Sequence, residues 1–215
     1  MRSGSVLAVL VALVPGAVVA SCGAREDVSP GAPGPDASVP DSDAAVQDEP
    51  YFPDASCLVE IDEPPLLPAL HVPIGTDITW DSNPPSSGSH YPIWAAYQAY
   101  TSPVPRGYYV HDEEHGGIIL LYNCPDDGGC PDVAAALQSV SDAIPDDPLC
   151  AAAGQGVRVR TVITPDPLID VPVAAAAWGW VYKAQCVDLP TLTAFALQHY
   201  GQGPEVLCAN GTTEF

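Results

Sequence analysis

The sequence predicts an α+β (or α/β) domain in which a mixed β-sheet packs against two or three helices. Residues 116–122 form a continuous apolar run, which is typical of a strand buried on both faces. Residues 131–144 place apolar side chains at helical spacing, and residues 189–200 do so again at the end of the domain. Between them, residues 157–163 and 171–184 favour strands. This order of strand, helix, strand, strand and helix indicates a layered domain with a mixed sheet.

Shorter elements are expected before the first long strand. Residues 57–61 and 66–72 are predicted to be extended, since prolines there prevent a long helix. Residues 83–90 consist almost entirely of turn formers and should be a loop. Residues 93–100 are expected to make one or two helical turns, and residues 107–110 a strand.

The closing helix has recognisable ends. Asp188 is expected to cap its first turn, and Gly201 to stop it. His199 lies in the last turn, where a cation interacts favourably with the helix dipole. We therefore expect His199 to be a helix-terminal cation and not a metal ligand.

The first residues are typical of an export signal. An apolar run at 6–20 follows Arg2, but it is too short and interrupted for a membrane span, which needs about 20 apolar residues. Its end, Val19-Ala20-Ser21-Cys22, resembles the lipobox of bacterial lipoproteins, which implies a signal peptide at 1–21 and a lipid such as palmitate on Cys22. An ordinary secretory signal is the alternative. Gly23 favours the outer over the inner membrane, with the domain facing the periplasm or the cell surface.

The chain then changes composition twice. Residues 22–56 are dominated by Pro, Gly, Ala, Ser and Asp, and cannot bury enough apolar surface to fold. We expect the lipidated cysteine to be followed by a disordered acidic tether over this range. Residues 57–215 suit a single domain with one hydrophobic core.

The charge balance restricts the partners. The formal net charge is -21 with six basic residues, so no basic patch can neutralise nucleic-acid phosphates. The lipid is the expected membrane anchor, since an anionic surface would repel the domain. Such a field attracts metal cations, which makes a metal ion an expected partner. The sequence names no protein partner.

The cysteines agree with export. Of the seven, Cys22 is assigned to lipid, which leaves an even number for three disulfides in an exported domain. Cys124 and Cys130 flank a tight turn and could close a local loop, while Cys57 is expected to tie the start of the domain to a later segment. The absence of a CxxC pair disfavours a zinc ribbon. The six are Cys57, Cys124, Cys130, Cys150, Cys186 and Cys208.

Unusual chemistry is concentrated in residues 83–122. The segment from His111 to His115 reads HDEEH and formally matches HxxEH, the inverted zinc-protease pattern, in which a helix presents both histidines. Gly116 and Gly117 follow at once, and then a strand-like run. We therefore expect this segment to be a turn at a sheet edge, and a protease of that class is disfavoured.

Three motifs carry a family resemblance. PPSSGSH at 84–90, GYYVHDEEHGGIILLY at 107–122 and the later AAAAWGW resemble the bacterial DUF3105 family, whose pattern runs approximately PPTSGPH, VHNLEHGG and AWG. The resemblance spans about residues 68 to 206 and matches His71 to an upstream histidine. Asp112 and Glu113 replace the commoner Asn-Leu pair and are expected to add charge beside the site. The family name records an unknown function, so the resemblance implies a fold and a site rather than an activity.

The histidines are numerous enough for a metal centre. His71, His90, His111 and His115 are predicted to ligate one divalent transition metal, with zinc or copper favoured because oxidised cysteines leave nitrogen and oxygen donors. Glu114 is the candidate catalytic residue, as the base for a metal-bound water, or alternatively orients a histidine.

The sequence thus predicts a cell-envelope lipoprotein with a His/Glu-rich site for a divalent transition metal. One alternative is a non-catalytic structural or interaction module, in which the histidines only hydrogen-bond loops. A second is a metal-dependent hydrolase that uses Glu114. Whether the protein is an enzyme is left open by the sequence.

Overall fold

A computed structural model describes residues 57–124 and 130–215. The predicted signal peptide, Cys22 and the tether lie outside these residues. Within the described ranges, no helix has the length and apolar character needed to cross a membrane.

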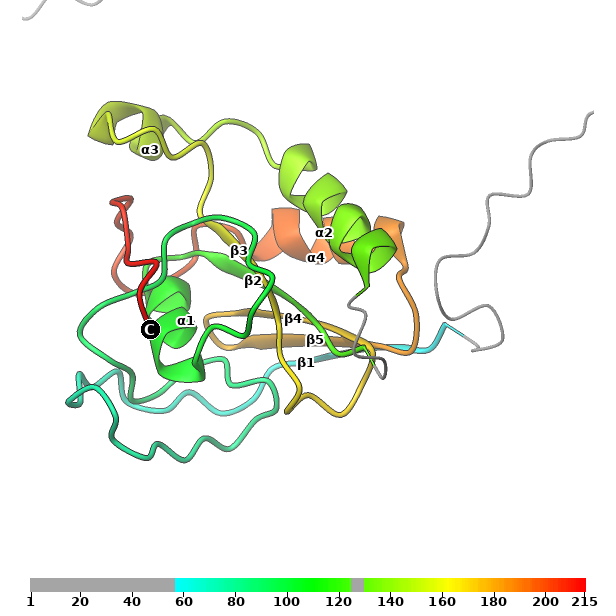
Figure 1. Cartoon of the computed structure of the whole chain (residues 1–215), viewed down its shortest axis with the longest axis horizontal. Helices are drawn as coiled ribbons and strands as arrows, with labels where there is room; N and C mark the ends of the chain where they lie inside the picture. The colour runs from blue at the N-terminus through cyan, green and yellow to red at the C-terminus, as the bar shows by residue number, and fades with distance from the viewer. Residues whose placement is uncertain (1–56, 125–129) are drawn as a thin grey trace, which may run out of the picture. The chain divides into compact units, whose positions relative to one another are not determined.

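The fold class is confirmed as α+β with a mixed five-stranded sheet (Figure 1). The strand order is β1-β5-β4-β2-β3, and only the β2–β3 pair is parallel. The strands are β1 (Val59–Asp62), β2 (Ile118–Tyr122), β3 (Thr161–Pro165), β4 (Val173–Ala177) and β5 (Trp180–Ala184).

Helices cover both faces of the sheet. The described residues contain four, α1 (Arg106–Glu114), α2 (Pro131–Ala143), α3 (Pro148–Ala153) and α4 (Leu189–His199), where two or three were predicted. Helices α2 and α4 lie side by side on one face, and α1 lies against the other (Figure 1). The short α3 stands away from the sheet (Figure 1).

Strand β2 divides the core into two layers. Ile118 and Leu120 pack with α2 and α4, whereas Ile119 and Leu121 pack with α1. Every residue of β2 is buried, which explains why the strand reads as a continuous apolar run. The small side chains of β4 (Val173–Ala177) are buried on both faces beside it.

The predicted disulfides are present among the described cysteines. Cys57 pairs with Cys186, and Cys124 with Cys130, as the sequence suggested for the start of the domain and for the local loop. Cys150 pairs with Cys208 and connects α3 to the C-terminal segment.

The segment predicted as a strand at 107–110 and a turn at 111–115 is in fact helix α1. Its Tyr-Tyr-Val sequence favours strands, but tertiary packing overrides this preference because nearly the whole helix is buried. The glycines that seemed to exclude a helix end it. Gly116 has φ +78°, its amide donates to the Glu113 carbonyl, and the Gly117 amide donates to the Asp112 carbonyl, which together form a Schellman stop.

Three other expectations need correction. Residues 93–100 form no helical turn; Ala95 and Ala99 instead make isolated bridges to Thr212 and Ile163, distant segments that no local pattern predicts. The strand predicted at 157–163 begins at Thr161. The region 171–184 holds two strands, β4 and β5, rather than one.

The closing helix begins and ends nearly as predicted, and the Asp188 carboxylate accepts the Thr191 amide at 3.2 Å. The prediction for His199 is wrong. Its side chain is buried and stacked on Trp180 with ring centroids 4.4 Å apart. Burial lowers the pKa of His199, so it is a neutral core residue and not a helix-terminal cation.

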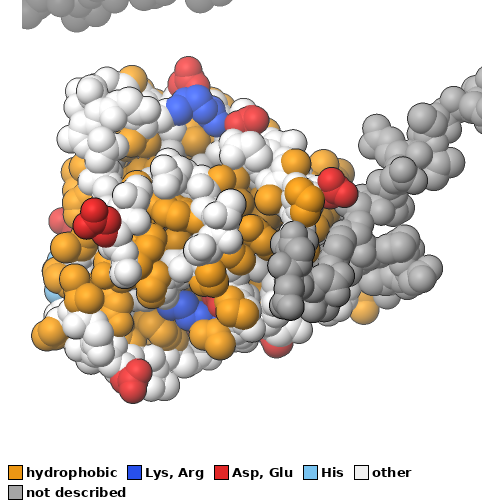
Figure 2. Space-filling model, in the orientation of Figure 1, with side chains coloured by type: hydrophobic (Ala, Val, Ile, Leu, Met, Phe, Trp, Pro, Cys, Tyr) orange, Lys and Arg blue, Asp and Glu red, His pale blue; other side chains and the backbone are white. Residues whose placement is uncertain are grey.

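The face of the domain shown in Figure 2 mixes hydrophobic side chains with polar ones, with acidic side chains mostly toward its edge and few basic ones. Exposed apolar side chains also flank His71 in the sequence, at Leu66, Leu70 and Ile74.

Candidate functional site

Helix α1 supplies two groups of the site. His111 and Glu114 are three residues apart, which places them on one face of the helix. The first turn is fixed by Asp166, whose carboxylate accepts from Arg106 Nε at 2.9 Å and from Tyr109 Oη at 3.0 Å. The Schellman stop fixes the other end, so the helix holds these side chains on a rigid support.

Two extended segments supply the other groups. His71 and His90 lie opposite each other in an isolated parallel bridge, in which the Val72 amide donates to the His90 carbonyl at 2.9 Å. The loop before His90 is buried rather than exposed, and Gly88 has φ +108°. The positive φ favours glycine, and a Cβ there would lie 3.1 Å from the Leu67 side chain, which would have to move slightly.

The four side chains converge. The ring centroids of His71, His90 and His111 are 4.7–4.9 Å apart, and all three Nε2 atoms face the same oxygen, Oε2 of Glu114. The Nε2–Oε2 distances are 2.9 Å for His90 and 3.8 Å for both His71 and His111. The ligand atoms of this group all lie within 4.8 Å of one another.

Hydrogen bonds fix the tautomers of the two buried histidines. Nδ1 of His90 is 2.8 Å from the Gly88 carbonyl, and Nδ1 of His111 is 2.6 Å from the Tyr91 carbonyl. A carbonyl only accepts, so each Nδ1 carries the proton and donates it. In the neutral imidazoles, Nε2 is then a lone pair directed into the cluster, as metal-binding histidines require.

Two atoms at the centre of the cluster have no hydrogen-bond partner among the described residues. His90 Nε2 and Glu114 Oε2 are buried and neither makes a hydrogen bond, although they are 2.9 Å apart. Burial lowers the pKa of His90, and lowers that of His111 to about 3, aided by the neighbouring histidines. The cluster therefore brings neutral nitrogen donors against a carboxylate oxygen, an arrangement that a cation would stabilise.

The spacing also suits one ion. Two ligand atoms of a tetrahedral zinc ion lie about 3.4 Å apart, since each bond is about 2.0–2.2 Å long. The separations of 2.9 and 3.8 Å from Glu114 Oε2 bracket this value. Access is from the side of His71, whose side chain is 51% exposed, while those of His90 and His111 are buried.

The fourth predicted ligand, His115, does not join this group. Its ring packs edge-on against Trp94, with centroids 4.6 Å apart, and its Nε2 is 3.9 Å from Oε2 of Glu205. Together with Glu114 these two residues form a second, adjoining group of possible ligands. Glu205 was missed from the sequence, because no local pattern marks a glutamate that the fold brings from a distant segment.

The inverted zinc-protease pattern is thus present on a helix, but the residues are arranged differently from that pattern. In that pattern both histidines of the motif would bind the same metal ion. Here His111 joins Glu114 in the cluster with His71 and His90, whereas His115 lies in the second group. Metal binding by these residues, and a base role for Glu114, stay predictions.

Asp112 and Glu113 do not add the charge that was expected. Both are fully buried, and burial raises the pKa of each well above its ordinary value. Asp112 Oδ2 accepts the Ala95 amide at 3.1 Å, and no described residue bonds to either oxygen of Glu113. Burial thus disfavours the charged forms of both carboxyls, which belong to the packing of α1.

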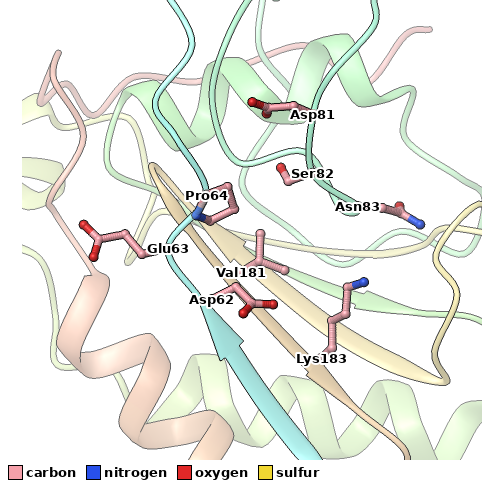
Figure 3. Close-up of a pocket in the computed structure, with 8 residues that line it drawn as sticks. All are labelled: Asp62, Glu63, Pro64, Asp81, Ser82, Asn83, Val181 and Lys183. Atoms are coloured by element: carbon pink, nitrogen blue, oxygen red, sulfur yellow. The ribbon is translucent and has the colours of Figure 1, made fainter.

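A separate pocket of about 390 Å³ lies between β1, β5 and the loop at 81–83 (Figure 3). Asp62, Asp81 and Lys183 line it, and none of the clustered histidines does. Lys183 Nζ is 3.1 Å from Asp170 Oδ1, so its charge is already paired. This pocket is separate from the histidine cluster.

The fold and the cluster define a class: an α+β domain that carries three histidines and a glutamate as a group able to hold a metal ion. The chain belongs to the DUF3105 family, described as a protein of unknown function, whose model matches residues 71–211. All four clustered residues lie within the match. No curated protein and no solved structure matches the chain.

Proposed function

We propose that this protein binds a divalent transition metal through His71, His90, His111 and Glu114. The observation that carries the proposal is the convergence of three Nε2 atoms on one carboxylate oxygen, where the buried atoms His90 Nε2 and Glu114 Oε2 lack a hydrogen-bond partner. Buried polar atoms are normally hydrogen-bonded. A metal ion supplies the missing partner for every one of these atoms at once.

Zinc or copper fits the donor set best. Neutral imidazoles suit zinc, copper, iron and nickel, and a single carboxylate oxygen is compatible with all of them. The described cysteines are paired in disulfides and offer no thiolate. Three imidazoles with one carboxylate leave a net charge of about +1 on a bound divalent ion, which the acidic chain offsets.

We further propose that the protein is exported and anchored to a membrane by a lipid on Cys22. The lipobox-like end of the leader and the disulfides of the domain support this location. Labelling the expressing cells with radioactive palmitate tests it. The label should enter the wild-type protein, and a Cys22→Ser variant should take up none; equal labelling of both would contradict the assignment.

A purely structural role for the histidines is less well supported by the contacts. A structural His90 would bond to Glu114 as a donor, but its Nδ1 already holds the proton and its Nε2 forms no hydrogen bond within the described residues. A hydrolase that uses Glu114 as the base would need a carboxylate outside the ligand group. We therefore favour metal binding without assigning a reaction.

Metal content after dialysis tests the proposal. The full chain, with its disulfides formed and without an affinity tag, is dialysed against zinc or copper and then against buffer, and the bound metal is measured by elemental analysis. Wild type should retain at least one equivalent. His71→Ala should lose most of it, and is chosen because a half-exposed side chain can be removed without disturbing the core.

The matched control is His199→Gln, which removes a buried histidine outside both ligand groups. It should retain as much metal as wild type. Negligible metal in wild type, or equal retention by wild type and His71→Ala, would contradict the proposal.

A further inference from the structure

The second group of donors adjoins the first and shares one residue with it. Glu114, His115 and Glu205 each offer a ligand atom, and these atoms lie within 4.8 Å of one another. Oε2 of Glu114 faces the three histidines of the first group, and a second ion would take Oε1 of the same carboxylate. A carboxylate that binds two ions through its two oxygens is a common bridge in two-metal sites, whose ions are about 3.5–4 Å apart.

His115 packs against Trp94, but its ring nitrogens have no hydrogen-bond partner among the described residues. It is 1% exposed, and its Nδ1 is buried with no hydrogen-bond partner. The carboxylate nearest its Nε2 is Glu205 Oε2 at 3.9 Å, beyond hydrogen-bond distance. The 3.9 Å between Nε2 and the Glu205 oxygen leaves room for an ion between them, since two ligand atoms of one tetrahedral zinc ion lie about 3.4 Å apart.

Backbone contacts hold Glu205 close to the end of α1. Its amide donates to the Glu114 carbonyl at 3.0 Å. Gly203, two residues earlier, packs so tightly that an added Cβ would lie within 3 Å of the Glu114 carbonyl and the Gly116 amide. The Cys150–Cys208 disulfide holds the segment on its other side. Glu205 is thus fixed in its backbone and free only in its side chain.

Charge is favourable for a cation here. The second group offers Glu205 and a share of Glu114, and its nearby cation, Arg160, is already paired with Asp147 at 3.0 Å. Arg160 donates to the backbone carbonyl of His115 and not to its ring. The side chain of Glu205 is 63% exposed, so the second ion would be open to solvent.

We propose that Glu114, His115 and Glu205 hold a second divalent metal ion, with the Glu114 carboxylate bridging it to the first. This inference rests on the proposed function of the first group. The second ion has fewer protein ligands and an exposed one, so it binds more weakly. Its remaining positions would be open to water, because the Glu205 side of the group is exposed.

Metal stoichiometry of the full chain tests the proposal. Titration with Zn²⁺ should fill two sites in wild type, the second at least tenfold weaker. Glu205→Gln and His115→Gln should each bind one equivalent with the affinity of the stronger site. Glu60→Gln, an exposed glutamate on β1 outside both groups, is the control and should bind two.

The outcomes separate the two proposals. One equivalent in wild type, unchanged in Glu205→Gln, overturns the second site and leaves the first. Two equivalents in all variants place the second ion elsewhere and also overturn it. No binding in wild type overturns both.

Cu²⁺ tests the bridge itself, because two copper ions joined by one carboxylate couple their unpaired electrons. At two equivalents of Cu²⁺, the electron paramagnetic resonance signal of wild type should be diminished and broadened. Glu205→Gln at one bound equivalent should show the spectrum of an isolated copper ion. An isolated spectrum from wild type with both ions bound would contradict a shared carboxylate.

Discussion

At the scale of single residues, the contact between His90 and Glu114 decides how the cluster is understood. The two side chains approach to 2.9 Å, yet the proton of His90 is on the far nitrogen, where it is donated to Gly88. Without a cation, a nitrogen lone pair faces a carboxylate oxygen in a buried place. With a cation, both atoms are satisfied. An ion pair and a metal site predict opposite changes in the stability of the metal-free protein when Glu114 is replaced by glutamine.

Glu114→Gln should weaken metal binding and at the same time stabilise the metal-free protein. The amide replaces a negative oxygen by an NH₂ group, which can donate to the buried, unpaired lone pair on Nε2 of His90. A hydrogen bond of this kind contributes about 1 kcal/mol. Urea unfolding in the presence of a chelator measures the gain, and zinc titration measures the loss, which should exceed tenfold.

The sign of the stability change in the metal-free protein distinguishes the two interpretations. If Glu114→Gln lowers the stability of the metal-free protein, then His90 is protonated and paired with the carboxylate, and the cluster is a salt bridge rather than a ligand set. Glu205→Gln serves as the control for metal-free stability. Its exposed side chain makes no hydrogen bond among the described residues, so it should change little.

Acid should weaken the metal-free fold through His111. Burial lowers its pKa to about 3 in the folded protein, against 6.5 in an unfolded chain. Between these values the unfolded chain binds a proton that the folded one does not, so the stability present above pH 6.5 is lost as the pH falls. Each pH unit in this window costs about 1.4 kcal/mol.

The contribution of His111 is isolated by comparing His111→Asn with wild type, since other buried groups titrate in both. Between pH 7 and pH 4.5, wild type should lose about 2 kcal/mol more than the variant, measured by urea unfolding with chelator present. Parallel pH dependence of the two proteins would show that His111 is not held neutral by burial.

At the scale of elements, the end of α1 is the critical junction. The last helical residue is Glu114, and Gly116 follows in the turn that ends the helix. Gly201 and Gly203 of the C-terminal segment pack closely against this end. The amide of Gly201 donates to the Gly116 carbonyl at 2.9 Å. The position of the carboxylate therefore depends on a segment that lies far away in the sequence.

Gly203→Ala should weaken both the fold and the metal site. The new methyl group would lie far inside contact distance of the Glu114 carbonyl and the Gly116 amide, so the end of the helix must move, which displaces the carboxylate from the three imidazoles. Changes to groups that orient metal ligands typically cost 10- to 100-fold in affinity. We expect a loss of about tenfold or more in zinc affinity, measured by competition with a chromogenic chelator.

Gly154→Ala is the control. Gly154 ends α3 with φ +67° and has no atom within 4 Å of an added Cβ, so alanine strains the backbone there without touching α1. It should lower the melting temperature and leave zinc affinity within about twofold of wild type, because only the change at Gly203 reaches the ligand helix. Equal losses of affinity would indicate general destabilisation instead of a local effect on the site.

This junction also shows where sequence reasoning succeeds and fails. The strand at Ile118–Tyr122 and the helices α2 and α4 follow from apolar periodicity, which is a local property. Helix α1 was mistaken for a strand because Tyr108, Tyr109 and Val110 favour strands, and their burial by distant segments is invisible locally. The glycines after it were read as excluding a helix, although glycine is the usual residue after a helix end.

At the scale of the whole molecule, the disulfides and the sheet hold the site segments together. Cys57–Cys186 closes the longest loop, with a sequence separation of 129 residues. It fixes β1 to the end of β5, on the sheet edge opposite β3. Cross-links that close long loops restrict the unfolded chain most.

Replacing Cys57 and Cys186 together by serine should therefore lower stability without emptying the metal site. The chain-entropy account predicts a loss of about 4 to 5 kcal/mol for a loop of this length. Neither cysteine belongs to a ligand group, so the folded variant should bind zinc with the wild-type stoichiometry. Urea unfolding measures the first and elemental analysis the second; a folded variant without metal would show that the disulfide positions the site.

The location of the site could be predicted from the sequence, but the full set of its residues could not. His90, His111 and Glu114 lie in recognisable motifs, and His71 was added through the family resemblance. His115 was grouped with them because spacing alone does not say which side of a helix end a residue faces. Glu205 required the fold, since only the path of the C-terminal segment brings it to the end of α1.

The most direct test of the central claim is X-ray absorption at the zinc edge on the full chain loaded with one equivalent of Zn²⁺. We predict three imidazole nitrogens and one carboxylate oxygen at about 2.0–2.2 Å, with no sulfur. His71→Ala should lower the imidazole count by one. A spectrum of a hydrated ion with oxygen ligands only, or one that His71→Ala leaves unchanged, would contradict the metal centre proposed for His71, His90, His111 and Glu114.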